Sequence, residues 1–197
     1  MDYFSREEAD VIGEISNICI GSSATALNKM LKQPVIITTP DVSLIKKNEI
    51  LNDYEDSCIV VKVQYTKGLY GTNLMALKDG DAKIITDLMM GNDGHGDYST
   101  GDITLLHLSA ISEAMNQMTA SSATAMSKMF NTAIDISPPT VESIVIDEFK
   151  FSDDIPDDIF VKINFRLTIG KLIDSTIMQL YPLDLANSIY NLFQRRK

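Results

Sequence analysis

The chain has 197 residues, enough for one medium domain or two closely packed halves with a substantial core. Its 17 basic and 27 acidic residues give a formal net charge of −10, the wrong sign for binding nucleic acid or an anionic membrane surface. No apolar run approaches the ~18 residues of a membrane-spanning helix, and residues 1–10 are too acidic for a signal peptide. We therefore expect a cytoplasmic protein with neither nucleic-acid nor membrane partners.

The first half of the sequence predicts a helix, strands, a hairpin and a second helix. Ser5 and Glu8 have the spacing of a capping box, and apolar residues such as Ile15 and Ile18 recur at three- and four-residue steps as far as Lys32. The later elements, in order, are strands at Val35–Thr39 and Val42–Ile45, a polar loop at Asn48–Asp56, a hairpin of Cys58–Tyr65 and Leu69–Leu77, and a helix at Asp79–Met90.

The second half predicts the same elements in the same order. They are a helix from Asp102 or Thr104 to Phe130, strands at Ile134–Ser137 and Val141–Ile146, an acidic loop at Phe149–Asp158, a hairpin of Ile159–Leu167 and Leu172–Leu180, and a helix opened by Pro182. The Gly- and Asp-rich segment Gly91–Asp97 separates the halves. It lacks the ligand spacing of a calcium loop, so we interpret it as a flexible connector.

One motif occurs twice, ninety-nine residues apart. Asp10, Glu14 and Asn17 followed by Pro40 return as Ser109, Glu113 and Asn116 followed by Pro139. The small residues of Ser22–Ala26 also return, as Ser121–Ala125. We therefore expect an α+β fold with pseudo-twofold symmetry, antiparallel strands and two long helices, in a single domain over 1–197 with internal repeats 1–98 and 99–197.

Each motif forms a polar stripe along one face of a predicted helix, because residues three and four apart share a face. An ordinary solvated face would also be polar. A solvated face, however, has no need to keep Glu and Asn at a fixed distance from a proline while neighbours that we assign to the core, Ile18 and Gln117, differ. Asp10 and Glu14 also place like charges together at a small local cost, which favours a functional role.

Other kinds of site are less well supported. The runs of Gly, Ala, Ser and Thr are typical of close helix packing, and their serines lack the setting of a nucleophile. His95 and His107 occupy non-equivalent positions in the two halves, and no zinc site can be assembled. Cys19 and Cys58 are interpreted as buried thiols without a disulfide.

A carboxylate and a carboxamide limit the chemistry that is available. The amide of Asn17 or Asn116 both donates and accepts hydrogen bonds, so it could hold a water molecule for attack on a phosphorus atom. Neither residue neutralises the charge that develops on a transferring phosphoryl group, a task that needs Mg²⁺ and a Lys or Arg. Any phosphorylated substrate must therefore bring its own metal ion and cation, as a folded phosphoprotein can.

The repeated pattern [DS]-x3-E-x2-N-x22-P resembles the signature of the CheC, CheX and FliY family of bacterial chemotaxis phosphatases, and within it the middle domain of FliY-type motor switch proteins. The segments Gly13–Ile18, Gly21–Leu27, Glu113–Met118, Ile136–Pro139 and Asp174–Pro182 carry this closer similarity. The resemblance covers essentially the whole chain.

The resemblance implies hydrolysis of the aspartyl phosphate of the response regulator CheY, which would supply Mg²⁺ and a lysine; no cofactor or metal of the chain's own is expected. Asn17 and Asn116 would orient the water, and Glu14 and Glu113 would pair with that lysine, at two equivalent sites. Asp10, Ser109, Pro40 and Pro139 would support them.

The same resemblance implies the motor switch proteins FliM and FliG as partners of a longer parent chain, at the cytoplasmic face of the flagellar motor, and leaves an interaction with CheD open. The alternative is a non-catalytic rotor or adaptor module that binds phosphorylated CheY and motor-switch proteins.

Overall fold

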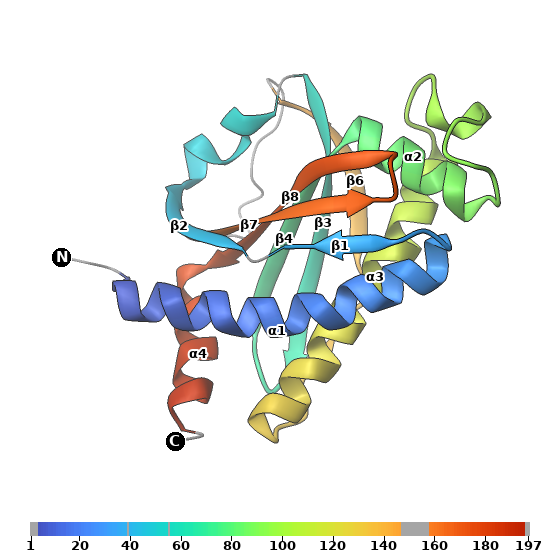
Figure 1. The fold of residues 1–197 in the computed structure, drawn as a ribbon. Coiled ribbons are helices and arrows are strands. Elements are labelled where there is room, and N and C mark those ends of the chain that lie inside the picture. The colour runs from blue at the N-terminus through green and yellow to red at the C-terminus, as the bar shows by residue number, and fades with distance from the viewer. Residues whose placement is uncertain (1–3, 39, 55, 147–157, 196–197) are drawn as a thin grey trace.

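Two helices of equal length, α1 (Arg6–Leu31) and α3 (Leu105–Phe130), cross in front of an antiparallel sheet (Figure 1). The computed structural model describes residues 4–38, 40–54, 56–146 and 158–195. The fold is a mixed α+β structure, and the equivalent placement of its two halves gives it the expected pseudo-twofold symmetry. Within these ranges no helix is both long and apolar enough to cross a membrane.

Both long helices are closed by side-chain caps. Ser5 Oγ accepts from Glu8 N at 3.2 Å and Glu8 Oε2 accepts from Ser5 N at 2.6 Å, which confirms the predicted capping box. Thr104 is the N-cap of α3, and its backbone N–H donates to His107 Nδ1 at 3.1 Å. His107 therefore has a structural role at this cap.

The described strands form one eight-stranded sheet in the order β1-β7-β8-β4-β3-β5, with β2 also on β7 and β6 also on β3. Their bounds are β1 Val35–Ile37, β2 Asp41–Lys46, β3 Ser57–Lys67, β4 Gly71–Lys78, β5 Asp135–Ile136, β6 Thr140–Val145, β7 Ile159–Ile169 and β8 Ile173–Pro182. The predicted hairpins are present as β3–β4 and β7–β8.

The two halves exchange their short strands. β1 and β2 pair with β7 of the second half, in a register that places Asp41 opposite Asn164. β5 and β6 pair with β3 of the first half, with Thr140 opposite Lys62. The sheet is closed at its centre by β4 on β8. The halves therefore share a single sheet.

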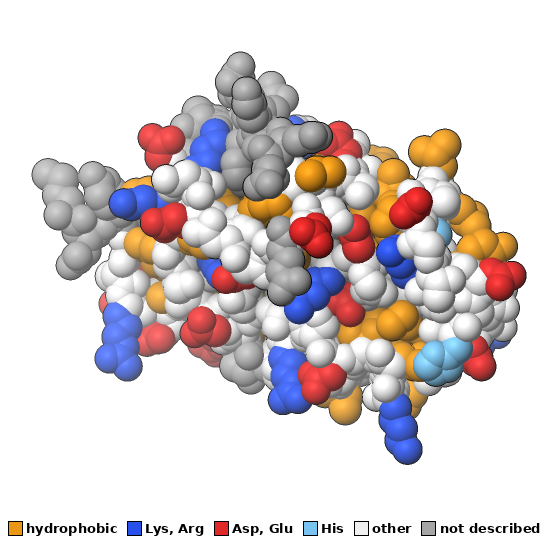
Figure 2. All heavy atoms as spheres, turned by 90° about the horizontal axis from the view of Figure 1, so that it is seen from above, with side chains coloured by type: hydrophobic (Ala, Val, Ile, Leu, Met, Phe, Trp, Pro, Cys, Tyr) orange, Lys and Arg blue, Asp and Glu red, His pale blue; other side chains and the backbone are white. Residues whose placement is uncertain are grey.

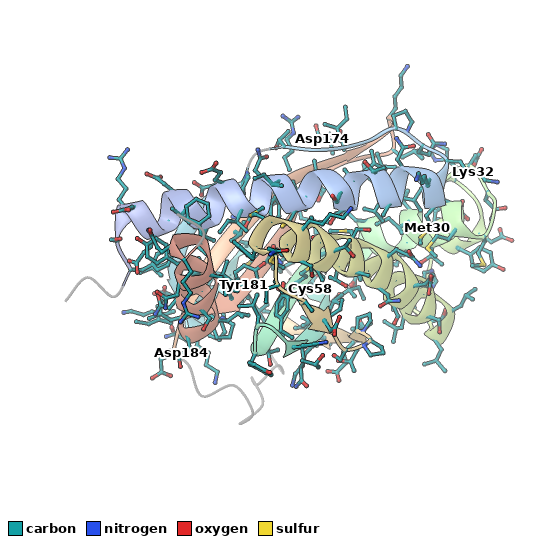
Figure 3. The ribbon with its side chains drawn as sticks, turned by 90° about the horizontal axis from the view of Figure 1, so that it is seen from below. Met30, Lys32, Cys58, Asp174, Tyr181 and Asp184 are labelled. Carbon is teal, nitrogen blue, oxygen red and sulfur yellow. The ribbon has the colours of Figure 1, made fainter. Side chains whose placement is uncertain are left out.

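The core lies on both faces of this sheet. On one face, buried residues of the long helices such as Ile12, Leu27 and Met115 pack with strand residues such as Val61 and Ile163. α2 (Asp79–Met89) and α4 (Leu183–Gln194) complete this layer, and Figure 3 shows α4 beside the N-terminal part of α1. Figure 2, seen from above, shows acidic and basic side chains interspersed on the surface.

The opposite face of the sheet holds a second, smaller core that the sequence did not reveal. The 3-10 helix η1 (Lys47–Asp53) packs Ile50, which is 1% exposed, into a cluster with Phe160 and Met178. The prediction of a polar loop at Asn48–Asp56 was therefore wrong. Most of this segment is a 3-10 helix that packs on the sheet through the buried side chain of Ile50. The predicted loop Phe149–Asp158 lies, apart from Asp158, outside the described residues.

The segment between the halves is folded around a buried carboxylate and includes the short helix η2 (Asp97–Ser99). Asp87, which is 0% exposed, accepts hydrogen bonds from the backbone N–H groups of Gly94, Gly96 and Tyr98 and from the Asn92 amide. Burial by itself would raise the pKa of the Asp87 carboxyl, but these donors together lower it. The interpretation of Gly91–Asp97 as a simple flexible connector missed this hydrogen-bonded loop.

Candidate functional site

The first predicted site lies on the outer face of α1. Asp10, Glu14 and Asn17 are all exposed, while Ile12 and Ile15 between them are buried in the core. The helical period thus separates the two sets of side chains as the sequence predicted. Among the described residues no side chain donates a hydrogen bond to the Glu14 carboxylate.

The second predicted site lies on the equivalent face of α3. Ser109 and Glu113 are exposed, and Asn116 is partly exposed. Ala114 and Met115 are buried, so this helix is oriented by its apolar side in the same way as α1. Both glutamates and both asparagines can therefore be reached from solvent.

Each proline of the motif lies beside the helix of its own half. Pro40 directly precedes β2, and a Cβ placed on Gly13 would lie 3.4 Å from Val42 Cγ2, so α1 packs on this strand next to Glu14. Pro139 directly precedes β6, and Ser112 Oγ donates to Pro139 O at 3.5 Å, next to Glu113. In both halves, the segment that begins at the proline supports the helix turn that carries the glutamate.

The two sites are separated by the crossing of the helices. Ser23 Oγ lies 2.9 Å from Ser122 Oγ, so the predicted small-residue runs do form the close helix contact. At ~1.5 Å per residue, each motif asparagine lies about 9 Å along its helix from this crossing. The sites therefore lie apart from each other, and each can be approached by its own partner molecule.

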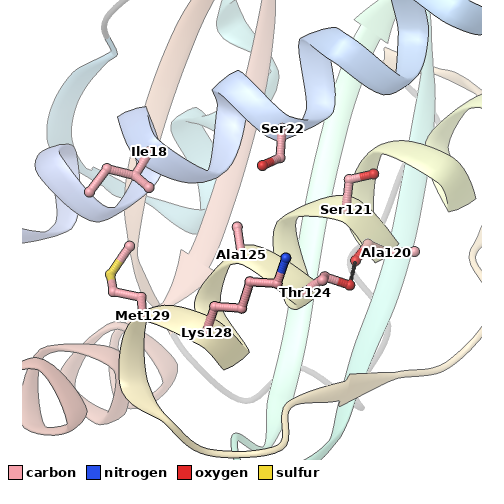
Figure 4. A pocket seen from close by; sticks show the side chains of 8 residues that line it. All are labelled: Ile18, Ser22, Ala120, Ser121, Thr124, Ala125, Lys128 and Met129. Carbon is pink, nitrogen blue, oxygen red and sulfur yellow. Dashed lines mark hydrogen bonds between the residues drawn. The ribbon is translucent and has the colours of Figure 1, made fainter.

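A hollow lies beside each site, on either side of the crossing. The larger, of about 660 Å³, is shown in Figure 4. It is lined by Ile18, Ser22, Ala120, Ser121, Thr124, Ala125, Lys128 and Met129. The other, of about 500 Å³, is lined by the equivalent residues Gln117, Ser121, Ser22, Thr25, Ala26, Lys29 and Met30. Each hollow thus begins at the residue that follows a motif asparagine.

The assignment of Ile18 and Gln117 to the core was wrong. Ile18 is 50% exposed and Gln117 is also exposed, because both lie at the rim of the helix groove next to the motif asparagines. Gln117 Nε2 donates to Glu113 Oε1 at 3.0 Å. The i,i+4 spacing of Glu113 and Gln117 is the signal in the sequence that could have identified this contact.

The two cysteine thiols are buried and do not belong to these exposed faces. Cys19 and Cys58 are buried free thiols, as predicted, and burial raises the pKa of each to about 12. Across the described part of the chain, no three His, Cys, Asp or Glu side chains converge to form a possible metal site. What each site presents is a carboxylate and an amide, one helical turn apart and open to solvent.

This arrangement can complete a reaction centre held by another molecule. A solvent-facing amide can bind a water molecule through both its donor and its acceptor groups. A solvent-facing carboxylate can pair with a cation on a partner. Neither can by itself stabilise the charge of a transferring phosphoryl group.

Comparison with known proteins yields one family. The model of the CheC-like family matches residues 7–44 and 106–143, two segments at the same offset as the motif. The flagellar motor switch phosphatase FliY of Bacillus subtilis (strain 168) is 51% identical over 197 residues, 97% of this chain and 51% of that protein. The chain therefore spans about half the length of this relative.

Solved structures agree with this result. The crystal structure of Thermotoga maritima FliY has a TM-score of 0.90 and 35% identity, and the match covers 98% of this chain and 99% of that chain. The FliM middle domain from H. pylori has a TM-score of 0.74 at 13% identity, over 95% of this chain and 99% of that chain. The similarity to FliM shows a shared fold alone.

Proposed function

Since the chain belongs to the CheC-like family, we propose that it is a phosphatase that hydrolyses the aspartyl phosphate of the chemotaxis response regulator CheY. The observation that carries this proposal is the exposed pair of Glu and Asn one helical turn apart, present on both α1 and α3. A relative over nearly the whole chain is named a phosphatase, which supports a hydrolase.

The proposed chemistry divides the reaction centre between two proteins. Asn17 and Asn116 orient the attacking water in line with the phosphorus atom. Glu14 and Glu113 pair with the lysine of the regulator and fix its orientation. Mg²⁺ and that lysine belong to the substrate, and they stabilise the charge on the phosphoryl oxygens. Asp10, Ser109, Pro40 and Pro139 support the two pairs.

The proposed setting is the cytoplasmic face of the flagellar motor. A relative named a flagellar motor switch phosphatase is about twice as long as this chain, so the partners of such a longer protein are part of the proposal. They include FliM and FliG. The net charge of −10 supports neither nucleic acid nor an anionic membrane as a partner.

The test is multiple-turnover release of phosphate from phosphorylated CheY by sub-stoichiometric protein. Asn17→Ala and Asn116→Ala should each remove part of the activity, and the double variant nearly all of it. Asn28→Ala is the matched control, because Asn28 is an exposed asparagine of α1 outside the motif. It should retain the wild-type rate.

The same assay separates the enzyme from a non-catalytic rotor or adaptor module. A module that only binds phosphorylated CheY would slow its decay or leave it unchanged, and it would release no more than stoichiometric phosphate. If the double asparagine variant accelerates the decay of phosphorylated CheY as much as the wild-type protein does, the assignment of the sites is ruled out.

A further inference from the structure

We propose that the two sites are unequal. The site on α1 binds the phosphorylated regulator more tightly than the site on α3, and its affinity depends more steeply on salt. This inference rests on the proposed function, because it concerns how each site takes the same substrate. It follows from two pairs of equivalent exposed residues that differ, Asp10 against Ser109 and Ile18 against Gln117.

The first difference is charge. Asp10 lies one helical turn before Glu14 on the same exposed face, so the α1 site presents two carboxylates to an approaching lysine. The equivalent residue of α3 is Ser109, so that site presents only Glu113. Interactions between exposed charges are screened within about 10 Å at 0.1 M salt, so the advantage of Asp10 should shrink as salt is added.

The second difference is the state of the glutamate. Gln117 Nε2 donates a hydrogen bond to Glu113 Oε1 at 3.0 Å, so part of the acceptor capacity of this carboxylate is already used within the protein. Ile18 replaces Gln117 at the α1 site and cannot donate to Glu14. Fixing Glu113 in one orientation reduces the entropy lost on binding, which acts in the opposite direction. An exposed hydrogen bond that exchanges readily with water orders the side chain only weakly, so we expect the charge difference to dominate.

The third difference is apolar surface. Ile18 is 50% exposed and directly follows Asn17 in the chain, and it lines the larger hollow, where Figure 4 shows it on the α1 side, near Met129 of α3. A regulator that contacts Asn17 would cover part of this side chain, and the burial of apolar surface favours binding. The smaller hollow has the polar Gln117 at the same place.

One-site variants test the inequality. Asn116→Ala leaves the α1 site and Asn17→Ala leaves the α3 site, and each is assayed for steady-state phosphate release at low and high salt. KM of the α1 site should be about three- to tenfold lower than KM of the α3 site at low salt. The ratio should fall as salt rises, because only the α1 site has the second carboxylate.

Exchanging the differing residues should exchange the behaviour. Asp10→Ser with Ile18→Gln, made in the Asn116→Ala background, should raise KM to the value of the α3 site. Ser109→Asp with Gln117→Ile, made in the Asn17→Ala background, should lower KM toward the value of the α1 site. All four positions are exposed, so thermal unfolding should change little. Asp56→Ser and Ile36→Gln remove an exposed carboxylate and an exposed apolar side chain elsewhere, and they should leave KM unchanged.

The outcomes separate this inference from the proposed function. A wild-type protein that releases no phosphate refutes both. A wild-type protein that turns over, with one-site variants of equal KM and equal salt dependence, overturns the inequality alone. Residue exchanges that leave KM unmoved would likewise assign the inequality to something other than these residues, and so overturn the inference.

Discussion

Ser23 Oγ lies 2.9 Å from the hydroxyl oxygen of Ser122, its own counterpart ninety-nine residues later. Ser23 Oγ also donates to Met118 O at 2.9 Å. A hydroxyl has one proton, so Ser122 must be the donor to Ser23. This contact marks the pseudo-twofold axis, where two chemically identical residues play unequal roles.

Removing the Ser23 hydroxyl should destabilise the helix crossing. Ser23 is 0% exposed, so Ser23→Ala leaves Ser122 without its acceptor, and we expect a loss of about 1–2 kcal/mol in the free energy of unfolding. The double variant with Ser122→Ala should cost less than the sum of the single changes, because both partners become apolar. Urea unfolding measures this. Ser22→Ala, at an exposed neighbour, is the control, and equal effects of Ser22→Ala and Ser23→Ala would contradict the assignment.

A matched pair of glycines tests how closely the halves pack. Gly68 and Gly101 both have φ of +75°, which an alanine adopts at a cost of about 1–2 kcal/mol. A Cβ on Gly68 would overlap the carbonyl oxygen of Ala133 in the second half, whereas a Cβ on Gly101 meets no atom within 4 Å. Gly68→Ala should therefore destabilise the protein by at least about 2 kcal/mol more than Gly101→Ala, as measured by thermal unfolding. Equal shifts would show that this turn can move away from Ala133.

Asp87 should make the loop between the halves sensitive to acid. Its pKa is lowered in the folded protein, so the unfolded chain takes up its proton first as pH falls. The stabilisation is present in full above the unfolded pKa of about 3.9 and is lost as pH falls through the folded pKa. At neutral pH, Asp87→Asn should lower Tm by about 3–10 °C, and the difference from wild type should shrink in acid.

Asp93→Asn is the control for Asp87. Asp93 lies in the same loop, but it is exposed, and among the described residues its one hydrogen-bond donor is His95 N, which an asparagine oxygen can also accept. It should leave the acid limb of the stability curve unchanged. A difference between Asp87→Asn and wild type that stays constant down to low pH would contradict the role of the charge.

The two cysteines should resist labelling in the folded protein. Burial raises the pKa of Cys19 and Cys58 to about 12, so almost no thiolate exists at pH 8, and both residues are buried. In denaturant, a thiol reagent should modify both residues within the mixing time. In native buffer, the reaction should be slower by a factor of at least about 100. Fast labelling of either residue in native buffer would show local opening.

Metal dependence should follow the regulator. If the Mg²⁺ of the reaction belongs to CheY, protein treated with a chelator and then desalted should turn over at the untreated rate once it meets Mg²⁺-loaded phosphorylated CheY. Chelator present during the assay should stop the reaction by removing the metal of the substrate. A chelated protein that needs its own metal restored before it can act would contradict this division.

The sequence predicted local features well, because these are set by neighbouring residues. The Ser5 cap, the hairpins and the outward-facing pairs Glu14–Asn17 and Glu113–Asn116 all follow from spacing along one helix or turn. Features that depend on backbone groups distant in the chain could not be predicted from the sequence. The carboxylate of Asp87 is held mostly by backbone N–H groups, so no pattern of side chains in the sequence identifies it as their acceptor.

Two smaller misses have similar causes. Ile50 is a single apolar residue in a polar stretch, and one residue has no periodicity from which burial could be inferred. Ile18 fits the apolar period of α1 but lies at the edge of its buried stripe, where it is 50% exposed and lines the hollow between α1 and α3. Whether Ile18 is buried depends on where α1 and α3 cross, and the sequence of α1 alone does not give that position.

The exchange of β1 and β2 for β5 and β6 has a consequence for any stand-alone version of one half. Severed from its companion, the first half would leave one long edge of β3 without hydrogen-bond partners, while its own β1 and β2 would have no β7 to join. The smallest self-sufficient assembly built from such halves is thus a pair, and a lone reaction surface of this kind could not be cut out and kept folded.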